Sequence, residues 1–311
     1  MKTTPNTHFR FATCCVLVAA IFLVIGAAPA MAAPVVVQSA SSAADGVLKD
    51  VAIAGTGTQP YPTTDTTLTP LGSNTGIQYN NMGWRPSDGL LYALEADVNG
   101  STGNMLTISP TTGLITTTTA ISGGSASLTS GVTYDAGDVN TDLDVLYISR
   151  LTVDNNLYIA DLTSPTFALS SLPITGITGN NLDYVADWAY DPNSKNLYGM
   201  DRDGDWATIN LVSGERTEIA DEIAGNATYG AAWYDPATED IFVYGNSPSG
   251  TGAAIFQVDP TTGGRINTYG ATGTALHDGA YVGAAVPIPG AVWLLGSGLM
   301  GMVAIRKKKR G

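Results

Sequence analysis

Short runs of alternating apolar and polar residues, separated by turn-forming residues, fill the chain from about residue 46 to residue 283. Alternation with a period of two is typical of β-strands that bury one face. Helical periodicity is nearly absent from this part of the chain. Because turn signals recur at short intervals, the pattern predicts an all-β domain built as a sandwich, a barrel or a propeller.

A sequence motif that recurs along the chain, called the repeated phrase below, discriminates between these all-β folds. It consists of an aromatic residue, Asp or Pro, a turn, and an apolar pair with tyrosine. The copies are residues 83–92, residues 133–135 leading to 145–147, residues 189–192 leading to 196–198, and residues 233–236 leading to 241–244. A second hairpin follows each copy, and its markers, spaced 52, 49 and 49 residues apart, are Ser109, Asp161, Asn210 and Asp259.

A period near 50 residues with two hairpins per unit predicts four-stranded blades arranged around an axis, which is a β-propeller. Four units are clear, and a fifth begins at residues 278–282. We expect residues 46–53 and the region of residues 67–71 to complete it, because joining the two ends hides both edge strands of the ring. The prediction is therefore about five blades, with six blades or an open stack of sheets as alternatives.

Both ends of the chain are apolar and carry positive charge. Lys2 and Arg10 flank an apolar run over residues 11–28, and small residues at Ala30 and Ala32 suit signal peptidase. We therefore expect a signal peptide over residues 1–32, a flexible linker over 33–45 and the propeller over 46–283. His8 and both cysteines, Cys14 and Cys15, would leave with the signal peptide.

The C-terminal segment, residues 284–311, resembles a membrane-stop sequence. No charged residue occurs from residue 284 to residue 305, which is long enough for a short transmembrane helix. The basic cluster after it is expected on the cytoplasmic side and comprises Arg306, Lys307, Lys308, Lys309 and Arg310. A plain single-pass anchor is the simplest interpretation of these features.

Charge and composition exclude several function classes. The part between the two ends holds seven basic and 27 acidic residues, a net charge of −20. This charge argues against nucleic acid or anionic lipid as a partner. Without cysteine there is no thiol nucleophile, and a Ser-His-Asp triad would have to use His277.

Two acidic loops are candidate cation sites. Asp201, Asp203 and Asp205 alternate around a turn, as carboxylates do in calcium loops, but Val212 stands where an EF-hand needs glutamate. A solvated turn is the competing interpretation of this loop. The second acidic loop, with the same two interpretations, contains Asp135, Asp138, Asp142 and Asp144.

The C-terminal segment also resembles the PEP-CTERM class of bacterial sorting signals, in its Val-Pro-x-Pro variant. The residues that carry the resemblance are Val286, Pro287, Ile288 and Pro289, followed by the Trp-Leu-Leu-x-Ser-Gly-Leu stretch at residues 293–299. Ile288 stands in place of the name-giving glutamate. The resemblance implies an exosortase, a membrane transpeptidase, as the partner that cuts near the proline motif.

The repeated phrases resemble bacterial domains of unknown function that are predicted as propellers and often precede such sorting signals. The resemblance implies an exported protein that passes through the inner membrane to the cell surface or extracellular matrix. A structural, adhesive or exopolysaccharide-binding role follows from the sorting family's association with exopolysaccharide. The alternatives are a glycan hydrolase or lyase that works at the channel, and a membrane-anchored scaffold whose C-terminal segment is never removed.

Overall fold

The computed structural model divides the chain into two compact units, residues 1–32 and 33–311, and the second is described here. The structure describes residues 35–41, 45–52, 67–97, 100–129, 131–150, 155–177, 185–201, 204–220, 229–236, 238–246, 253–271 and 278–283. The predicted signal peptide and the C-terminal sorting segment lie outside these ranges. Within them the chain forms no helix, and hence none that is long and apolar enough to cross a membrane.

The described strands form five four-stranded antiparallel sheets. In four of them the strands follow one another along the chain. Their bounds are β4 (Gln78–Arg85), β5 (Leu90–Asp97), β6 (Gly100–Ile108) and β7 (Ile115–Ala120); β8 (Val139–Asn140), β9 (Val145–Ile148), β10 (Asn156–Asp161) and β11 (Leu169–Pro173); β12 (Val185–Asp191), β13 (Asn196–Asp201), β14 (Trp206–Asn210) and β15 (Arg216–Ala220); β16 (Tyr229–Asp235), β17 (Asp240–Asn246), β18 (Ala253–Val258) and β19 (Arg265–Ala271).

The fifth sheet joins the two ends of this unit. Its strands are β1 (Val35–Ser41), β2 (Asp45–Ala52), β3 (Thr67–Thr75) and β20 (Asp278–Tyr281), in the order β20-β1-β2-β3. Strand β20 pairs with β1, with Val36 opposite Ala280. The expected contribution of residues 46–53 and 67–71 is confirmed. The segment 33–45 was predicted as a linker, and that prediction is wrong, because β1 lies within it.

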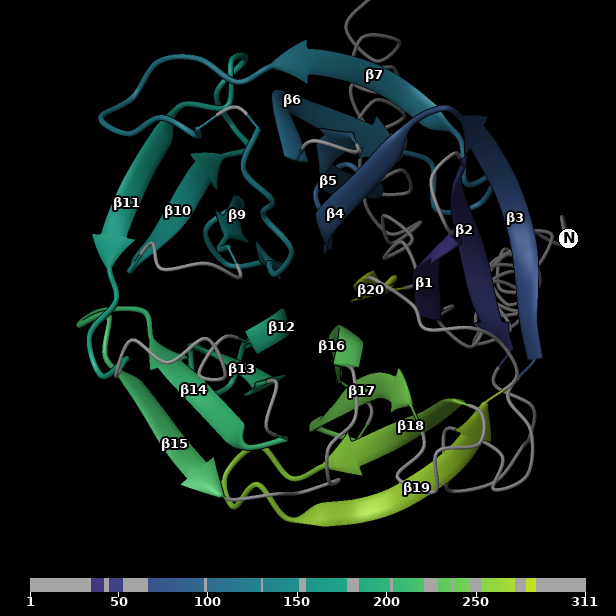
Figure 1. The fold of residues 1–311 in the computed structure, drawn as a ribbon, viewed down its shortest axis with the longest axis vertical. Coiled ribbons are helices and arrows are strands. Elements are labelled where there is room, and N and C mark those ends of the chain that lie inside the picture. The colour runs from purple at the N-terminus through teal and green to yellow at the C-terminus, as the bar shows by residue number, and fades with distance from the viewer. Residues whose placement is uncertain are drawn as a thin grey trace, which may run out of the picture. The chain divides into compact units, whose positions relative to one another are not determined.

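One strand of each sheet lies near a common centre (Figure 1). These inner strands are β4, β8, β12, β16 and β20. Contacts run from β12 to β16, from β16 to β20, from β20 to β4 and from β4 to β8. Figure 1 shows β3, β7, β11, β15 and β19 on the outside. The all-β, propeller-like arrangement predicted from the repeat is therefore confirmed.

Apolar side chains fill the space between neighbouring sheets. Trp206 of β14 is fully buried, and its ring stacks on Tyr198 with the ring centroids 6.1 Å apart. Phe256 of the next sheet belongs to the same core cluster. This packing explains the aromatic and β-branched composition of the strands, because such residues fill the space between packed sheet surfaces.

Equivalent turns connect the first two strands of each contiguous sheet. The residue just before β5, β9, β13 and β17 has a positive φ, between 53° and 72°, in all four cases; these residues are Gly89, Asp144, Lys195 and Glu239. The turn in the second sheet therefore follows β8 and Asn140. The repeat predicted from the sequence has residues 133–135 before this turn, and that alignment is wrong by five residues.

The markers of the second hairpin are confirmed as turn residues between the third and fourth strands. Each accepts a hydrogen bond from a backbone N–H two or three residues later, as Asp and Asn side chains do at turns. These bonds join Ser109 to Thr112, Asp161 to Thr163, Asn210 to Val212 and Asp259 to Thr261. The Pro-Thr-Thr-Gly turns end at Gly113 and Gly263, whose φ values are 70° and 67°.

Candidate functional site

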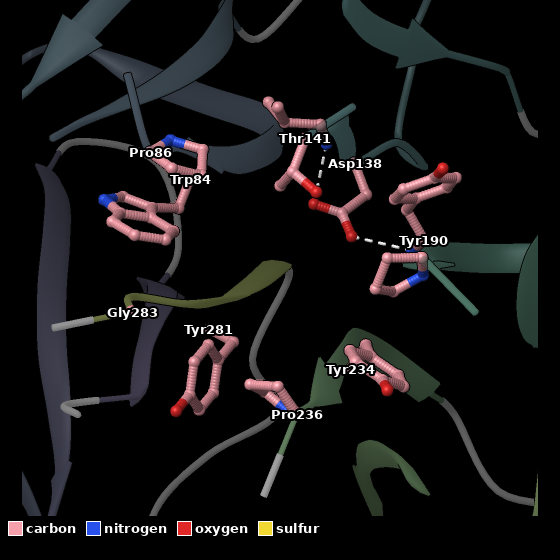
Figure 2. Close-up of a pocket in the computed structure, with 11 residues that line it drawn as sticks. Trp84, Pro86, Asp138, Thr141, Tyr190, Tyr234, Pro236, Tyr281 and Gly283 are labelled. Carbon is pink, nitrogen blue, oxygen red and sulfur yellow. Dashed lines mark hydrogen bonds between the residues drawn. The ribbon is translucent and has the colours of Figure 1, made fainter. Parts of the chain in front are cut away.

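A cavity of about 410 Å³ opens where the inner strands end. All five sheets contribute to its wall, each through one residue at or next to the end of its inner strand and a second residue two positions later. These pairs are Trp84 and Pro86, Val139 and Thr141, Tyr190 and Pro192, Tyr234 and Pro236, and Tyr281 and Gly283; Asp138 completes the lining. Figure 2 shows the aromatic and proline rings facing a common space.

The repeated phrase explains this composition. Its aromatic residue ends an inner strand, so the side chain lies at the mouth of the central channel. Its proline begins the turn to the next strand, where a fixed φ and a missing N–H suit the backbone. In the sequence alone, these residues are recognisable only by their position next to a turn. Because the same two positions recur in every sheet, five ordinary strand ends together form a ring-lined pocket.

Asp138 carries the only charged side chain among the eleven residues that line the cavity. One carboxylate oxygen accepts the N–H of Val139 at 2.7 Å, and the other accepts the N–H of Tyr190 in the neighbouring inner strand at 2.8 Å. Burial raises the pKa of Asp138 to about 7, against these two hydrogen bonds, which favour the carboxylate. The group can therefore be either a hydrogen-bond donor or an anion near neutral pH.

Two more carboxyl groups are buried on the same inner strands, three residues before Tyr190 and Tyr281. Asp187 accepts N–H groups from Gly137, Trp188 and Ala232, and Asp278 accepts those of Met82 and Gly279. Burial raises the pKa of both groups well above the ordinary range, and the charge of Asp278 raises that of Asp187 further. The two carboxyl groups interact with each other, and the interaction with Asp187 partly offsets the rise in the pKa of Asp278.

Gly283 sets the position of one wall of the cavity. A Cβ atom at this position would lie 2.5 Å from Cζ3 and 2.6 Å from Cη2 of Trp84. Real Cβ atoms do not come this close to a ring, so the indole occupies the space that a side chain at residue 283 would need. Because Gly283 has no side chain, the indole of Trp84 can reach the cavity.

The second acidic loop predicted as a candidate cation site does not converge on one point. Asp138 lines the cavity, whereas Asp142 binds Lys195 Nζ at 2.6 Å and accepts the hydroxyl of Tyr190. Asp144 forms an ion pair with Arg85 at 2.9 Å. Among the residues that the structure describes, no three His, Cys, Asp or Glu side chains are grouped to hold a metal.

The predicted calcium site at Asp201, Asp203 and Asp205 is only partly described. The Asp201 carboxylate is buried, binds Arg216 at 2.7 Å, and accepts the N–H of Asp205 at 2.9 Å. A cation at this loop would compete with Arg216 for that carboxylate. Asp203 lies outside the described residues, so the site stays a prediction.

The other predicted site residues also lie outside the described part of the chain. They are the proline motif at Val286–Pro289, the basic cluster at residues 306–310, and His277. Among the described residues singled out in the sequence as metal or sorting sites, Asp138 of the second acidic loop is the one that lines the cavity. The signal that could have indicated the cavity is the aromatic-x-Pro sequence at residues 84–86, 190–192 and 234–236.

Comparison with known proteins gives a family and a weak structural likeness. The model of a repeat of unknown function, DUF6923, matches residues 53–241. No curated protein matches the sequence. A hydrazine synthase of Kuenenia stuttgartiensis is a similar solved structure, with 12% identity and a TM-score of 0.40 over 62% of this chain. The matched part corresponds to 49% of that protein, so this chain spans about half its length.

Proposed function

The chain belongs to the DUF6923 repeat family, and we propose that it is an exported β-propeller that binds polysaccharide at the cell surface or in the extracellular matrix. In this proposal the five four-stranded sheets are the blades of one closed propeller. The cavity at the inner strand ends is its binding site. The proposal has two independent parts, ligand binding and delivery to the surface, and each has its own test.

The observation that supports ligand binding is the ring-lined cavity. Its volume of about 410 Å³ falls in the range of small-molecule sites, which are mostly apolar and carry a few placed polar groups. The aromatic residues offer flat apolar surfaces against which the C–H faces of a sugar ring can pack. Asp138 and Thr141 supply hydrogen-bonding groups that could orient sugar hydroxyls.

The same cavity favours binding over glycan hydrolysis. Hydrolysis by most glycosidases uses a pair of carboxyl groups on either side of the scissile bond. Asp138 is the one carboxyl group among the eleven lining residues, whereas Asp187 and Asp278 are not among them and accept hydrogen bonds from buried backbone N–H groups. The arrangement therefore supplies a binding surface more readily than an acid and base pair.

Binding is tested with the full-length protein, solubilised in detergent and passed over immobilised polysaccharides of different composition. Replacing Trp84 by Ala removes the largest flat surface of the cavity and is expected to weaken retention at least tenfold on the polysaccharide that binds. Ile266→Ala is the matched control, because Ile266 is 47% exposed on the outer strand β19. Equal retention of wild type and Trp84→Ala, with both folded by circular dichroism, contradicts binding at the cavity.

Delivery to the surface is proposed from the signal peptide over residues 1–32 and the proline motif Val286–Pro289 with its apolar and basic continuation. Signal peptidase and an exosortase are the processing partners in this proposal. The decisive measurement is the intact mass of protein recovered from the cell surface and the medium. A C-terminus near Pro289 supports sorting, and a chain that ends at Gly311 and needs detergent for extraction supports a permanent anchor instead.

A pair of substitutions tests the role of the motif. Replacing Pro287 and Pro289 by Ala is expected to hold the protein in the inner membrane in unprocessed form. Pro110→Ala, in a turn of the propeller, is the control for loss of a proline as such. Unchanged delivery of the double variant to the surface would show that the motif is not a sorting signal.

A further inference from the structure

We propose that the cavity selects a sugar residue that carries a protonated amine, as in a glucosamine-containing polysaccharide. This inference rests on the proposed binding of polysaccharide at the cavity and adds the chemical class of the sugar. Three features of the described residues carry it: the charge of the lining, the aromatic walls, and the free acceptor capacity of Asp138.

The charge of the lining has one sign. Asp138 is the only charged side chain at the cavity, and no lysine or arginine lines it. Asp187 and Asp278, three residues before the lining residues Tyr190 and Tyr281, are held protonated by burial and place no positive charge nearby. The segment between the two apolar ends of the chain adds a net charge of −20. Such a field attracts a cationic ligand and repels uronic acids or sulfated sugars.

The aromatic walls bind cations as well as apolar faces. The ring faces of tryptophan and tyrosine attract an ammonium group within about 6 Å of the ring centre. Trp84, Tyr190, Tyr234 and Tyr281 come from four different sheets and lie around the same space (Figure 2). An amino sugar could therefore place its ring against one aromatic side chain and its ammonium group near another.

Asp138 is placed to receive the ammonium group. Its side chain is only partly buried and is part of the cavity wall. Each carboxylate oxygen accepts one backbone N–H, from Val139 or Tyr190, and an oxygen of this kind can accept a second hydrogen bond. The two N–H groups hold the carboxylate in place, so an amine meets an acceptor that is already oriented. Charge-assisted hydrogen bonds of this kind are stronger than bonds between neutral groups.

The test measures binding of three oligosaccharides of equal length to the detergent-solubilised full-length protein by calorimetry. The probes are an oligomer of glucosamine, its fully N-acetylated counterpart, and a cello-oligosaccharide. The glucosamine oligomer is expected to bind at least tenfold more tightly than the other two. This comparison needs no variant, so it holds even where a substitution disturbs folding.

Asp138→Asn then tests the residue. The variant is expected to lose the preference for glucosamine while it still binds the neutral oligomers. Glu215→Gln is the matched control, because it removes one negative charge at an exposed turn of another sheet and should leave the preference unchanged. A preference that survives in Asp138→Asn would overturn the assignment to this carboxylate.

The outcomes separate the two proposals. Equal binding of the glucosamine and N-acetylated oligomers overturns the amino-sugar inference and leaves polysaccharide binding in place. Absence of binding for all three probes, together with no retention on any immobilised polysaccharide, overturns both.

Discussion

Three aspartates link the inner strands of this fold, each through hydrogen bonds from backbone N–H groups. Asp138 accepts from β12, Asp187 from β16 and Asp278 from β4. Carboxylates that accept backbone N–H groups satisfy donors that have no partner in a sheet ladder. Burial disfavours the charged form of each carboxyl group, and this raises the pKa of all three. The same residues therefore join the sheets and make their junction sensitive to pH.

The first prediction concerns this sensitivity. Between pH 5 and pH 8 the folded protein binds more protons than the unfolded chain, because the three carboxyl pKa values are raised on folding. The free energy of unfolding therefore falls as pH rises through this window. Asp138, whose pKa is raised to about 7, contributes on the order of 2 kcal/mol to this fall, and Asp187 and Asp278 add to it in the same direction. Urea titrations at pH 5, 6, 7 and 8 check this, and a free energy that rises toward pH 8 would contradict it.

The second prediction concerns the buried ion pair of Arg216 and Asp201, whose side chains are 5% and 2% exposed. Arg216→Met leaves a buried carboxylate without its cation, which typically lowers the free energy of unfolding by about 3–5 kcal/mol. Adding Asp201→Asn removes the buried negative charge and should restore part of the loss. Urea denaturation of the wild type, the single variant and the double variant measures both steps. A single variant as stable as the wild type would be inconsistent with this account.

At the scale of elements, the inner turns are the repeating feature of the sheets, and four equivalent positions there have positive φ. Gly89 occupies one of them, whereas Glu239 at an equivalent position has φ 62°. A side chain in this left-handed region costs about 1 kcal/mol, which glycine avoids.

The third prediction follows from this equivalence. Glu239→Gly is expected to raise the free energy of unfolding by about 0.5–1 kcal/mol, because it removes the strain at an exposed turn. Gly89→Ala is the reciprocal control and should lower it by a similar amount. Thermal denaturation measures both, and a Glu239→Gly variant less stable than the wild type would show that the turn is not strained.

The same turns show how far the sequence predicts the structure. Turns with Pro, Gly or Asp-Pro were recognised because those residues fix or permit the required backbone angles. The turn after Asn140 was missed because Thr141–Asp144 contains neither Pro nor Gly, and Asp144 adopts φ 53° without glycine. An aromatic residue and an acid at Tyr134 and Asp135 resembled the phrase more closely, although they precede the strand end by five residues.

The cavity could not be predicted for a different reason. Its walls come from five sheets, and no local pattern states which residues end a strand at a common mouth. Asp138 looked like one of several acids in a loop, but it directly precedes Val139 of the inner strand β8 and so lines the cavity beside it. The aromatic-x-Pro repetition was visible, but its meaning depends on how the sheets are arranged around the centre.

At the scale of the whole molecule, the fifth sheet determines whether the ring is closed. Its inner strand β20 comes from the C-terminal side of the described chain, and its other three strands come from the N-terminal side. The paired residues Val36 of β1 and Ala280 of β20 are therefore 280 − 36 = 244 positions apart in the sequence. Such long-range pairing carries a large loop-closure entropy and forms late in folding.

The fourth prediction covalently fixes this pairing. Val36 and Ala280 are directly opposed partners in the antiparallel ladder, which is a register that suits a cross-strand disulfide. Cysteines at both positions, with Cys14 and Cys15 replaced by Ser, are expected to form a disulfide that stabilises the fold by about 4 kcal/mol. Reduction of the disulfide is the control. A melting temperature that does not change on reduction would indicate that opening of this sheet does not limit stability.

The location of β20 has a mechanical consequence. If the protein is held at its C-terminal end, tension along the chain enters through the innermost strand of the sheet that contains both ends of the described fold. The neighbour that resists this pull is β1, from the opposite end of the chain. The fifth sheet then bears the load first. Its opening releases both ends of the described fold together, while the four contiguous sheets are still intact.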